Sequence, residues 1–195
     1  MEKINNSYNI LTSEETAEKS KQEKEAYLLA NNIQEKLSKQ YPNLRIVFRG
    51  IQKGASAHNI PDSYIFDIWM EPLIIKQQPT TITLLTPNEQ SLTIKTKETL
   101  LAYIDSAIEL VENNLKSEYP NLKIAYKDYS SMLENRHFFQ LIYPNLIPPS
   151  PTDGKPSTSI SLKTISQETL FKEVKAVLDM YKEYGEKWPK QELDI

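Results

Sequence analysis

The chain has 195 residues, a net charge of −3 from 23 Lys and Arg against 26 Asp and Glu, no cysteine and four glycines. The absence of cysteine excludes disulfides, thiol nucleophiles and cysteine-ligated metals, and the glycines match neither G-x-x-x-x-G-K-[ST] nor G-x-G-x-x-G, which excludes nucleotide-binding loops of those types. The sequence has no apolar stretch of about 18 residues and no apolar signal-peptide core, so we expect a cytoplasmic protein without a membrane-spanning helix.

The first 24 residues are polar and rich in charge, which predicts either a solvated helical extension or a disordered tail. From about residue 25 a helix is predicted, because apolar residues recur at spacings of three and four. These residues are Ala26, Tyr27, Leu29, Ala30, Ile33 and Leu37. The helix should end near Tyr41, since Pro42 disfavours helical geometry in the residue before it.

Strands are expected after this helix. Alternation of apolar and polar residues predicts a strand over 44–49, and a second apolar run predicts another over 64–70. Residues 82–84 indicate a third strand, and residues 92–94, which follow the turn at 87–88, leave room for a fourth.

A second helix is predicted over 98–118, with Thr96 as its N-cap and Pro120 just beyond its end. Three more strands are then expected, at 122–126, 138–143 and 159–163. A last helix, capped by Ser166, should fray near Gly185.

An internal repeat organises these elements. Residues 36–48 align with 114–126, and both segments contain Tyr-Pro-Asn-Leu. Further matches in the same order pair 65–70 with 138–143 and 98–100 with 168–170. The sequence therefore predicts an α+β protein formed by tandem duplication of an α-βββ-α unit, with antiparallel sheets and a shared middle helix (α-βββ-α-βββ-α). The expected parts are an extension at 1–24, a first repeat at 25–118, a second repeat at 98–188 that shares helix 98–118, and a tail at 189–195.

The shared helix should be the most deeply buried one, because it serves two sheets. Its main apolar stripe runs from Leu100 to Leu115. We expect Leu101, Tyr103 and Leu110, which lie off that stripe, to contact the second unit.

Two histidines are the candidates for acid–base chemistry near neutral pH: His58 in a loop and His137 at the start of a strand. Neither H-x₃-H nor H-E-x-x-H spacing occurs, so we expect no zinc site. Both histidines are interpreted as polar loop or strand-edge residues. We predict no catalytic residue, no metal site and no cofactor.

The order of elements also matches the core of restriction-endonuclease-like nucleases, which use an acid on the second strand and an acid-x-Lys on the third to bind Mg²⁺. Asp62 and Asp67 could supply the first acid, but the third strand and its surroundings contain no acid-x-Lys. Asp67 is better interpreted as an outward polar residue. A degenerate nuclease-like site is left as an alternative.

The loop between the first two strands contains Gly54, His58 and Pro61, and Lys95 and Lys97 precede the second helix. In these residues and in its helix–three strands–helix order, the first repeat resembles the double-stranded-RNA-binding domain. The resemblance implies a loop that enters the minor groove and lysines that hold phosphates. The helix that follows is acidic, which disfavours nucleic acid as a partner; its acids include Glu98, Asp105, Glu109, Glu112 and Glu118.

Aromatic rings and prolines are the remaining candidates for recognition. Trp69 shares a strand face with Ile65 and Asp67, opposite the expected core face, and Tyr64 and His58 flank it in sequence. If helices cover one face of each sheet, the Trp69 face needs the other sheet, a second copy or a partner to cover it. The proline-rich loop at 144–158, with its P-x-x-P spacing, adds Pro148, Pro149 and Pro151.

From these patterns we predict a non-enzymatic protein-interaction module that binds a macromolecular partner through sheet and loop surfaces. The expected partner-binding residues are His58, Tyr64, Trp69, Pro148, Pro149 and Pro151. Adaptors, inhibitors, immunity proteins, chaperones and assembly factors all fit, with another protein or a second copy as the partner and no membrane involved. A nucleic-acid-binding module of the double-stranded-RNA-binding type is the first alternative, and a degenerate metal-dependent nuclease-like protein is the second.

Overall fold

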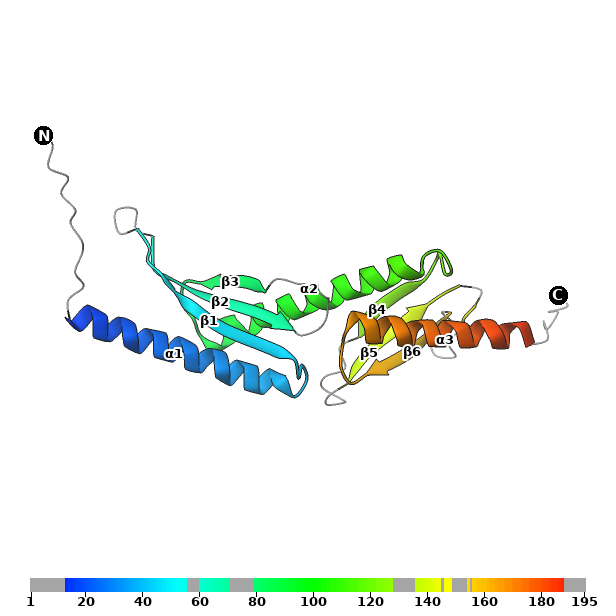
Figure 1. Cartoon of the computed structure of the whole chain (residues 1–195), viewed down its shortest axis with the longest axis horizontal. Coiled ribbons are helices and arrows are strands. Elements are labelled where there is room, and N and C mark those ends of the chain that lie inside the picture. Colours follow the sequence, from blue (N-terminus) through cyan, green and yellow to red (C-terminus); the bar gives the residue numbers. More distant parts are fainter. Residues whose placement is uncertain are drawn as a thin grey trace, which may run out of the picture.

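The structure, a computed structural model, describes residues 13–55, 60–70, 79–127, 136–144, 146–148, 154 and 156–187. Its elements are α1 (Ser13–Ser38), β1 (Leu44–Gln52), β2 (Ser63–Met70), β3 (Thr80–Leu84), α2 (Glu89–Leu115), β4 (Lys123–Lys127), β5 (His137–Ile142), β6 (Ser157–Leu162) and α3 (Gln167–Lys187). The predicted α-βββ-α-βββ-α order is confirmed (Figure 1). Of the polar extension, residues 13–24 are helical and continue α1, whereas residues 1–12 and the tail at 189–195 lie outside the described residues.

Each unit contains one antiparallel three-stranded sheet, in the order β1-β2-β3 in the first unit and β4-β5-β6 in the second. The centre of the first sheet aligns Ile46 with Ile68, and the centre of the second aligns Ile124 with Leu141. The register of β1 shifts at a bulge next to Gly50, whose φ of 148° is a conformation that other residues rarely adopt.

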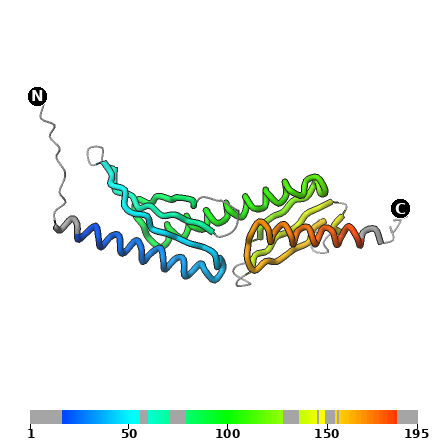
Figure 2. Tube along the Cα trace, viewed as in Figure 1, coloured from blue at the N-terminus to red at the C-terminus, as the bar shows by residue number. Residues whose placement is uncertain are grey.

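The molecule is elongated, and α2 joins its two halves. Figure 1 shows the first part of α2 beside the first sheet and its later part beside the second, while α1 and α3 lie at opposite ends. The tube in Figure 2 follows the same path, from the blue helix α1 at one end of the molecule to the orange helix α3 at the other. None of the described helices combines the length and apolar composition needed to cross a membrane.

The shared helix begins earlier than predicted. Asn88 is its N-cap: the Ser91 backbone N–H donates to Asn88 Oδ1 at 2.8 Å, and the Asn88 N–H donates to Ser91 Oγ at 3.3 Å. This reciprocal pair starts the helix at Glu89. The expected N-cap, Thr96, is a buried residue within the helix, and the expected fourth strand at 92–94 is helical.

Two apolar stripes on α2 serve the two sheets. Leu92, Thr96, Thr99 and Tyr103 are buried in its first half, and Ile104, Ile108, Val111 and Leu115 are buried in its second half. At about 100° per residue, these two sets point in directions that differ by roughly 120°. The second stripe was predicted from sequence; the first was not, because two threonines and a tyrosine interrupt its apolar pattern.

Three residues of α2 were expected to contact the second unit, and the structure places them otherwise. Leu101 and Leu110 are exposed. Tyr103 is buried, but its hydroxyl donates to the Ile68 carbonyl at 2.9 Å and lies 2.8 Å from the Thr80 hydroxyl, both in the first unit. The prediction that these three residues contact the second unit was therefore wrong. The face of α2 that packs on the first sheet differs from the face that packs on the second.

Tyr-Pro-Asn-Leu forms the same corner in both units. In the first, the Leu44 N–H donates to the Tyr41 carbonyl at 3.0 Å; in the second, the Leu122 N–H donates to the Tyr119 carbonyl at 3.1 Å. The predicted helix-to-strand corner is confirmed. The third copy of the tetrapeptide makes the same bond, from Leu146 to Tyr143 at 3.4 Å, after a strand rather than a helix. The four residues thus encode the turn, whatever element precedes it.

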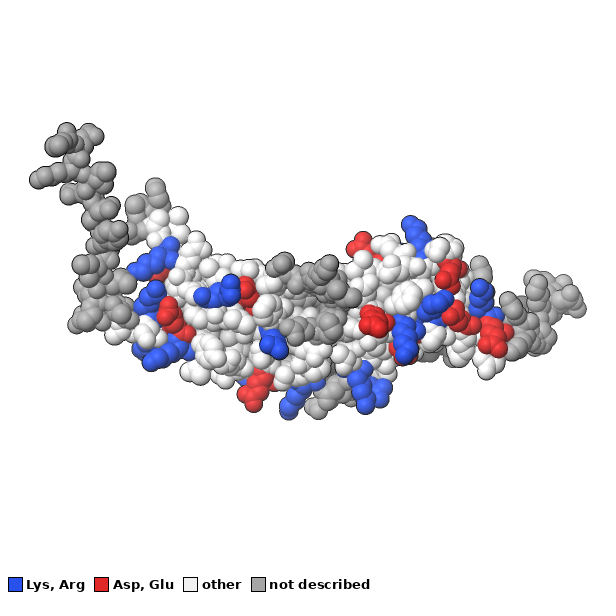
Figure 3. Space-filling view, viewed as in Figure 1, with Lys and Arg blue, Asp and Glu red and all other residues white. Residues whose placement is uncertain are grey.

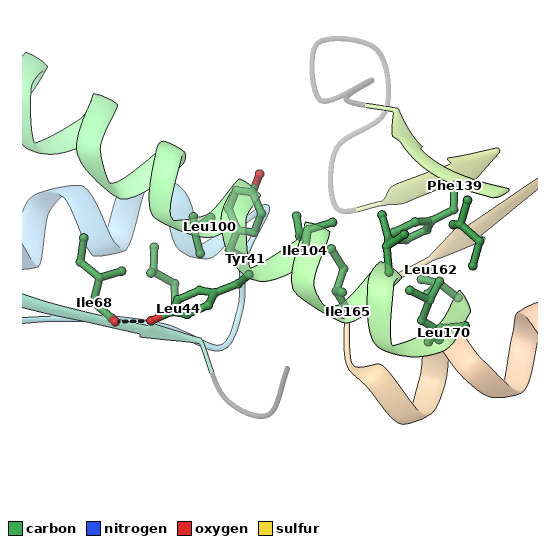
Figure 4. Close-up of a cluster of buried hydrophobic side chains, with 14 of the residues drawn as sticks. Tyr41, Leu44, Ile68, Leu100, Ile104, Phe139, Leu162, Ile165 and Leu170 are labelled. Carbon is green, nitrogen blue, oxygen red and sulfur yellow. Dashed lines mark hydrogen bonds between the residues drawn. The ribbon is translucent and has the colours of Figure 1, made fainter. Parts of the chain in front are cut away.

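The buried side chains form one cluster through both units. Figure 4 shows Leu44, Ile68 and Leu100 on one side and Phe139 and Leu170 on the other, with Ile104 and Ile165 between them. Ile104 of α2 lies where the buried side chains of the first unit meet those of the second, so the two units share a core.

Candidate partner-binding groove

Of the six predicted partner-binding residues, the three that the structure describes do not lie in one patch. His58, Pro149 and Pro151 lie outside the described residues. Tyr64 and Trp69 are both in β2, but they are five positions apart, so their side chains lie on opposite faces of the sheet. Tyr64 packs on the helix-covered face, with its ring 6.4 Å from that of Phe48, and Pro148 is exposed after β5 in the second unit.

Trp69 occupies the sheet face that α1 and α2 do not cover, as predicted, and it is half-buried there. Its Nε1 is buried and has no hydrogen-bond partner among the described residues. Asp67, two positions earlier in β2, lies on the same outward face, as expected for this polar residue, but it is buried there. Arg49 Nε lies 3.2 Å from Asp67 Oδ2, and the Thr81 hydroxyl donates to Asp67 Oδ1 at 2.8 Å. These two contacts compensate the buried carboxylate.

His137 is a buried link between the two units and is 1% exposed. Its Nε2 lies 2.9 Å from the carbonyl oxygen of Gln40, and its Nδ1 lies 3.1 Å from the Tyr126 hydroxyl. Because a carbonyl only accepts, Nε2 carries the proton, and in the neutral ring Nδ1 accepts from the hydroxyl. The imidazole also lies 5.3 Å from the ring of Tyr41. Substrate cannot reach this histidine from solvent, and its geometry is that of a structural residue.

Of the residues that carried the resemblance to the RNA-binding domain, Lys95 and Gly54 have contacts within the chain. Lys95 and Lys97 lie within α2, not ahead of it, and Lys95 Nζ is 2.8 Å from Glu98 Oε2. Gly54 uses its N–H to bond Asp62 Oδ1 at 2.8 Å, which makes Asp62 part of the loop's own structure. In the described part of the chain, no three His, Asp or Glu side chains group closely enough to hold a metal ion.

An open groove runs between α1 and the outer edge of β1, which lie side by side in Figure 1. It consists of two adjoining depressions of about 520 and 700 Å³. The first lies between Tyr27, Asn31 and Gln34 of α1 and residues 42–47. The second continues from Tyr27 towards Ser20 on one side and from Phe48 to Gly50 on the other.

Apolar side chains are exposed along this groove. Tyr27 is 56% exposed, Leu28 is 58% exposed and Val47 is 37% exposed. The prediction that Tyr27 belongs to the core stripe of its helix was wrong: the stripe consists of Ala26, Ala30, Ile33 and Leu37. Tyr27 instead lies on the side of α1 that faces the edge of β1.

A side-chain hydrogen bond holds α1 against this edge. Gln34 Oε1 accepts from the Ile46 backbone N–H at 2.8 Å. In the second unit, Glu112 Oε1 accepts from the Ile124 N–H at 2.7 Å. Each pair is related to the other by the same 78-position offset as the Tyr-Pro-Asn-Leu corners. The helix-to-edge arrangement is therefore common to both units.

Comparisons of the chain with models of protein families, with curated proteins and with solved structures found no match. The second unit of the chain itself is then the informative comparison.

The two units agree in their core but differ in the groove. The core positions of α1 correspond to Ile104, Ile108, Val111 and Leu115 of α2, all of them apolar and buried. The groove positions occupied by Tyr27, Leu28 and Val47 correspond to Asp105, Ser106 and Ala125. The fold therefore does not require apolar groups at those three positions. Sequence reasoning missed this groove, although aligning the repeats residue by residue would have shown that Tyr27 corresponds to an aspartate.

Proposed function

We propose that this chain is a non-enzymatic protein-interaction module whose partner binds in the groove between α1 and β1. The observation that carries the proposal is the exposure of Tyr27, Leu28 and Val47 at positions where the second unit has polar or small residues. Exposed apolar side chains that gather beside a depression are a feature of interaction sites. Tyrosine in particular is enriched among the residues that dominate binding energy.

The groove also has a rigid setting. Its floor is a hydrogen-bonded strand, and its wall is a helix whose inner face is buried against the sheet. A preformed site of this kind loses little conformational entropy on binding, which favours affinity. Adaptors, inhibitors, immunity proteins, chaperones and assembly factors use such surfaces, and the cysteine-free sequence supports a cytoplasmic location for this module.

Protein is favoured over nucleic acid as the partner. On the face shown in Figure 3, basic and acidic side chains are interspersed at both ends of the molecule and do not form a single basic surface. Binding to a phosphate backbone depends on concentrated Lys and Arg. The two lysines that could have met phosphates lie within α2, one of them paired with Glu98.

The test is affinity capture from lysate of the source cells with matched variants. The groove variant Tyr27→Asp/Leu28→Ser/Val47→Ala installs the residues of the second unit, so it should fold with an unchanged thermal midpoint and lose a stoichiometric partner. The control Leu101→Ser/Met180→Ala/Tyr184→Asp removes three apolar side chains of similar exposure elsewhere, at 42%, 43% and 58%. It should retain the partner.

A separate variant, Trp69→Ala, tests the surface expected from the sequence. If the groove is the binding site, this variant retains the partner as long as it folds. Loss of the partner in Trp69→Ala, with full retention in the folded groove variant, would refute the groove and favour the uncovered face of the first sheet. Equal capture by every variant would refute both surfaces.

A further inference from the structure

The outer edge of β1 is open to pairing over part of its length. β1 is an end strand, paired with β2 on one side. The Ile46 N–H points away from β2, because it donates to Gln34. Backbone groups alternate in direction along an antiparallel strand, so the N–H and C=O of Phe48 also point outward, into the groove. No hydrogen bond to these groups from another element is found within the described residues.

The groove has the length of a short strand. From Leu44 to Gly50, the strand covers about 20 Å at roughly 3.3 Å per residue. The facing part of α1, from Ser20 to Gln34, covers about 21 Å at roughly 1.5 Å per residue. An extended segment of about six residues matches this length, with Phe48 as its pairing point; side chains on one face of the segment would meet Tyr27, and those on the other face would meet Val47, which lies on the sheet face opposite Ile46.

The charged residues that line the groove are mostly basic. Lys24, Arg45 and Arg49 line it, against one acid, Glu23. Glu23 pairs with Lys19 at 3.8 Å and Arg49 pairs with the buried Asp67 at 3.2 Å, so the lining and these two partners together contain four basic and two acidic residues. The lining thus has an excess of positive charge in a protein whose net charge is −3.

The second unit differs in charge at the corresponding positions. Lys24 corresponds to Ala102, and Asn31 corresponds to Glu109. Together with the Tyr27-to-Asp105 difference, these changes give the second unit more negative charge where the first is basic and apolar. Arg45 and Arg49, by contrast, correspond to Lys123 and Lys127, so the basic residues of the strand are common to both units and only Lys24 is a basic residue specific to the first groove.

We propose that the occupant of the groove is an extended peptide segment of a partner protein, with acidic residues flanking alternate apolar ones, which adds to the outer edge of β1 as a further strand. The inference rests on the proposed function and specifies its partner. Main-chain hydrogen bonds to Phe48 supply affinity, the apolar wall selects alternate side chains, and the basic lining selects the flanks. This mode explains why the edge strand, the exposed apolar residues and the basic residues occur together.

The experiment uses the full chain and a phage-displayed random dodecapeptide library, with the groove variant as the counter-selection target. We expect the wild-type protein to enrich peptides in which Asp or Glu flanks alternating Val, Ile, Tyr or Phe. A synthetic peptide of the enriched sequence should bind at least tenfold more weakly to the groove variant and about tenfold more weakly to Lys24→Glu/Arg45→Glu. The Leu101→Ser/Met180→Ala/Tyr184→Asp control should bind it like the wild type.

Residue-resolved amide exchange tests the pairing itself. On binding of the peptide, the Phe48 amide should gain at least tenfold protection, whereas the Val47 amide, which points to β2, should change little. A peptide methylated at alternate backbone nitrogens should lose binding. Binding without protection of Phe48, or undiminished binding of the methylated peptide, overturns strand addition.

The other outcomes separate this inference from the proposed function. Enrichment of basic or proline-rich peptides, or no enrichment, overturns the inference. The proposed function is then still tested separately, by the lysate capture with the groove variant and its control. If light scattering shows a dimer that the groove variant does not form, the occupant of the groove is a second copy of the chain, and the inference of a partner peptide is overturned. Failure of both the library and the groove-dependent capture removes the proposed function together with the inference.

Discussion

His137 in β5 donates a hydrogen bond from Nε2 to the carbonyl oxygen of Gln40, 97 positions earlier in the chain, over 2.9 Å. The bond joins the corner that follows α1 to the second sheet. It is a connection between the units in addition to the covalent one through α2. A small void of about 10 Å³, lined in part by Tyr41, Met70 and Ile165, lies beside it, so the junction is closely packed.

His137→Phe keeps a ring of similar size but removes both hydrogen bonds of the imidazole. The Gln40 carbonyl and the Tyr126 hydroxyl then lose their bonds to the imidazole in a partly buried environment. We expect the free energy of unfolding to fall by about 1–3 kcal/mol, the range for the loss of hydrogen bonds to a buried polar side chain. Urea unfolding monitored by circular dichroism measures it. A change below about 0.5 kcal/mol would show that water replaces the histidine at no cost.

Gln34→Ala and Glu112→Ala should have similar effects, because each removes the acceptor for an edge-strand N–H. We expect a loss of about 0.5–1.5 kcal/mol for each variant. Glu112→Gln keeps an acceptor at the same place and serves as the control, with little change expected. Strongly unequal losses in the two alanine variants, measured by chemical denaturation, would contradict the structural equivalence of the two pairs.

Ile108→Ala tests the second stripe of α2. Ile108 is buried between the helix and the second unit, so we expect a loss of about 2–5 kcal/mol from the cavity and the lost transfer energy. Leu110→Ala, two residues further along on the exposed side, should change stability by less than about 0.5 kcal/mol. Equal effects in thermal unfolding would mean that α2 lies in a different rotation about its axis.

Because of Asp179 on α3, we expect the stability of the fold to depend on pH in the acid range. The Tyr119 hydroxyl donates to Asp179 Oδ1 at 2.5 Å, and this bond, together with the nearby Lys175 ammonium, lowers the pKa of Asp179 from its ordinary value. A carboxyl whose pKa is lower in the folded state than in the unfolded state stabilises the fold at pH values above its unfolded pKa, about 4. That stabilisation is lost as the pH falls through the carboxyl's pKa in the folded state.

Asp179→Asn removes this titration, so the wild type should be more stable near neutral pH and the difference should shrink below about pH 4. Thermal midpoints of both proteins across the acid range measure it. Burial, followed by the bond to Asp179, raises the pKa of the Tyr119 hydroxyl, so that hydroxyl remains a donor throughout this range. A difference that stays constant in acid would show that the aspartate contributes packing rather than charge.

Much of the architecture could be predicted from local patterns. Period-two alternation located the strands, and the spacing of apolar residues located the helices. Tyr-Pro-Asn-Leu specified its corner in each copy, since proline restricts the residue before it and the turn closes through a bond between Tyr and Leu of the same four residues. Matches spread in order along the chain then predicted two units that share a helix, as observed.

The candidate site depended on tertiary contacts. Tyr27 and Leu29 both fitted an apolar stripe, and only the rotation of α1 against β1 leaves Tyr27 exposed at the groove while Leu29 packs against the core. Likewise, the two stripes of α2 meet different sheets, which a single periodic pattern does not reveal. A sequence records which residues are apolar along each element; the packing of helix on sheet decides which of them are buried, because each sheet covers only one side of each helix.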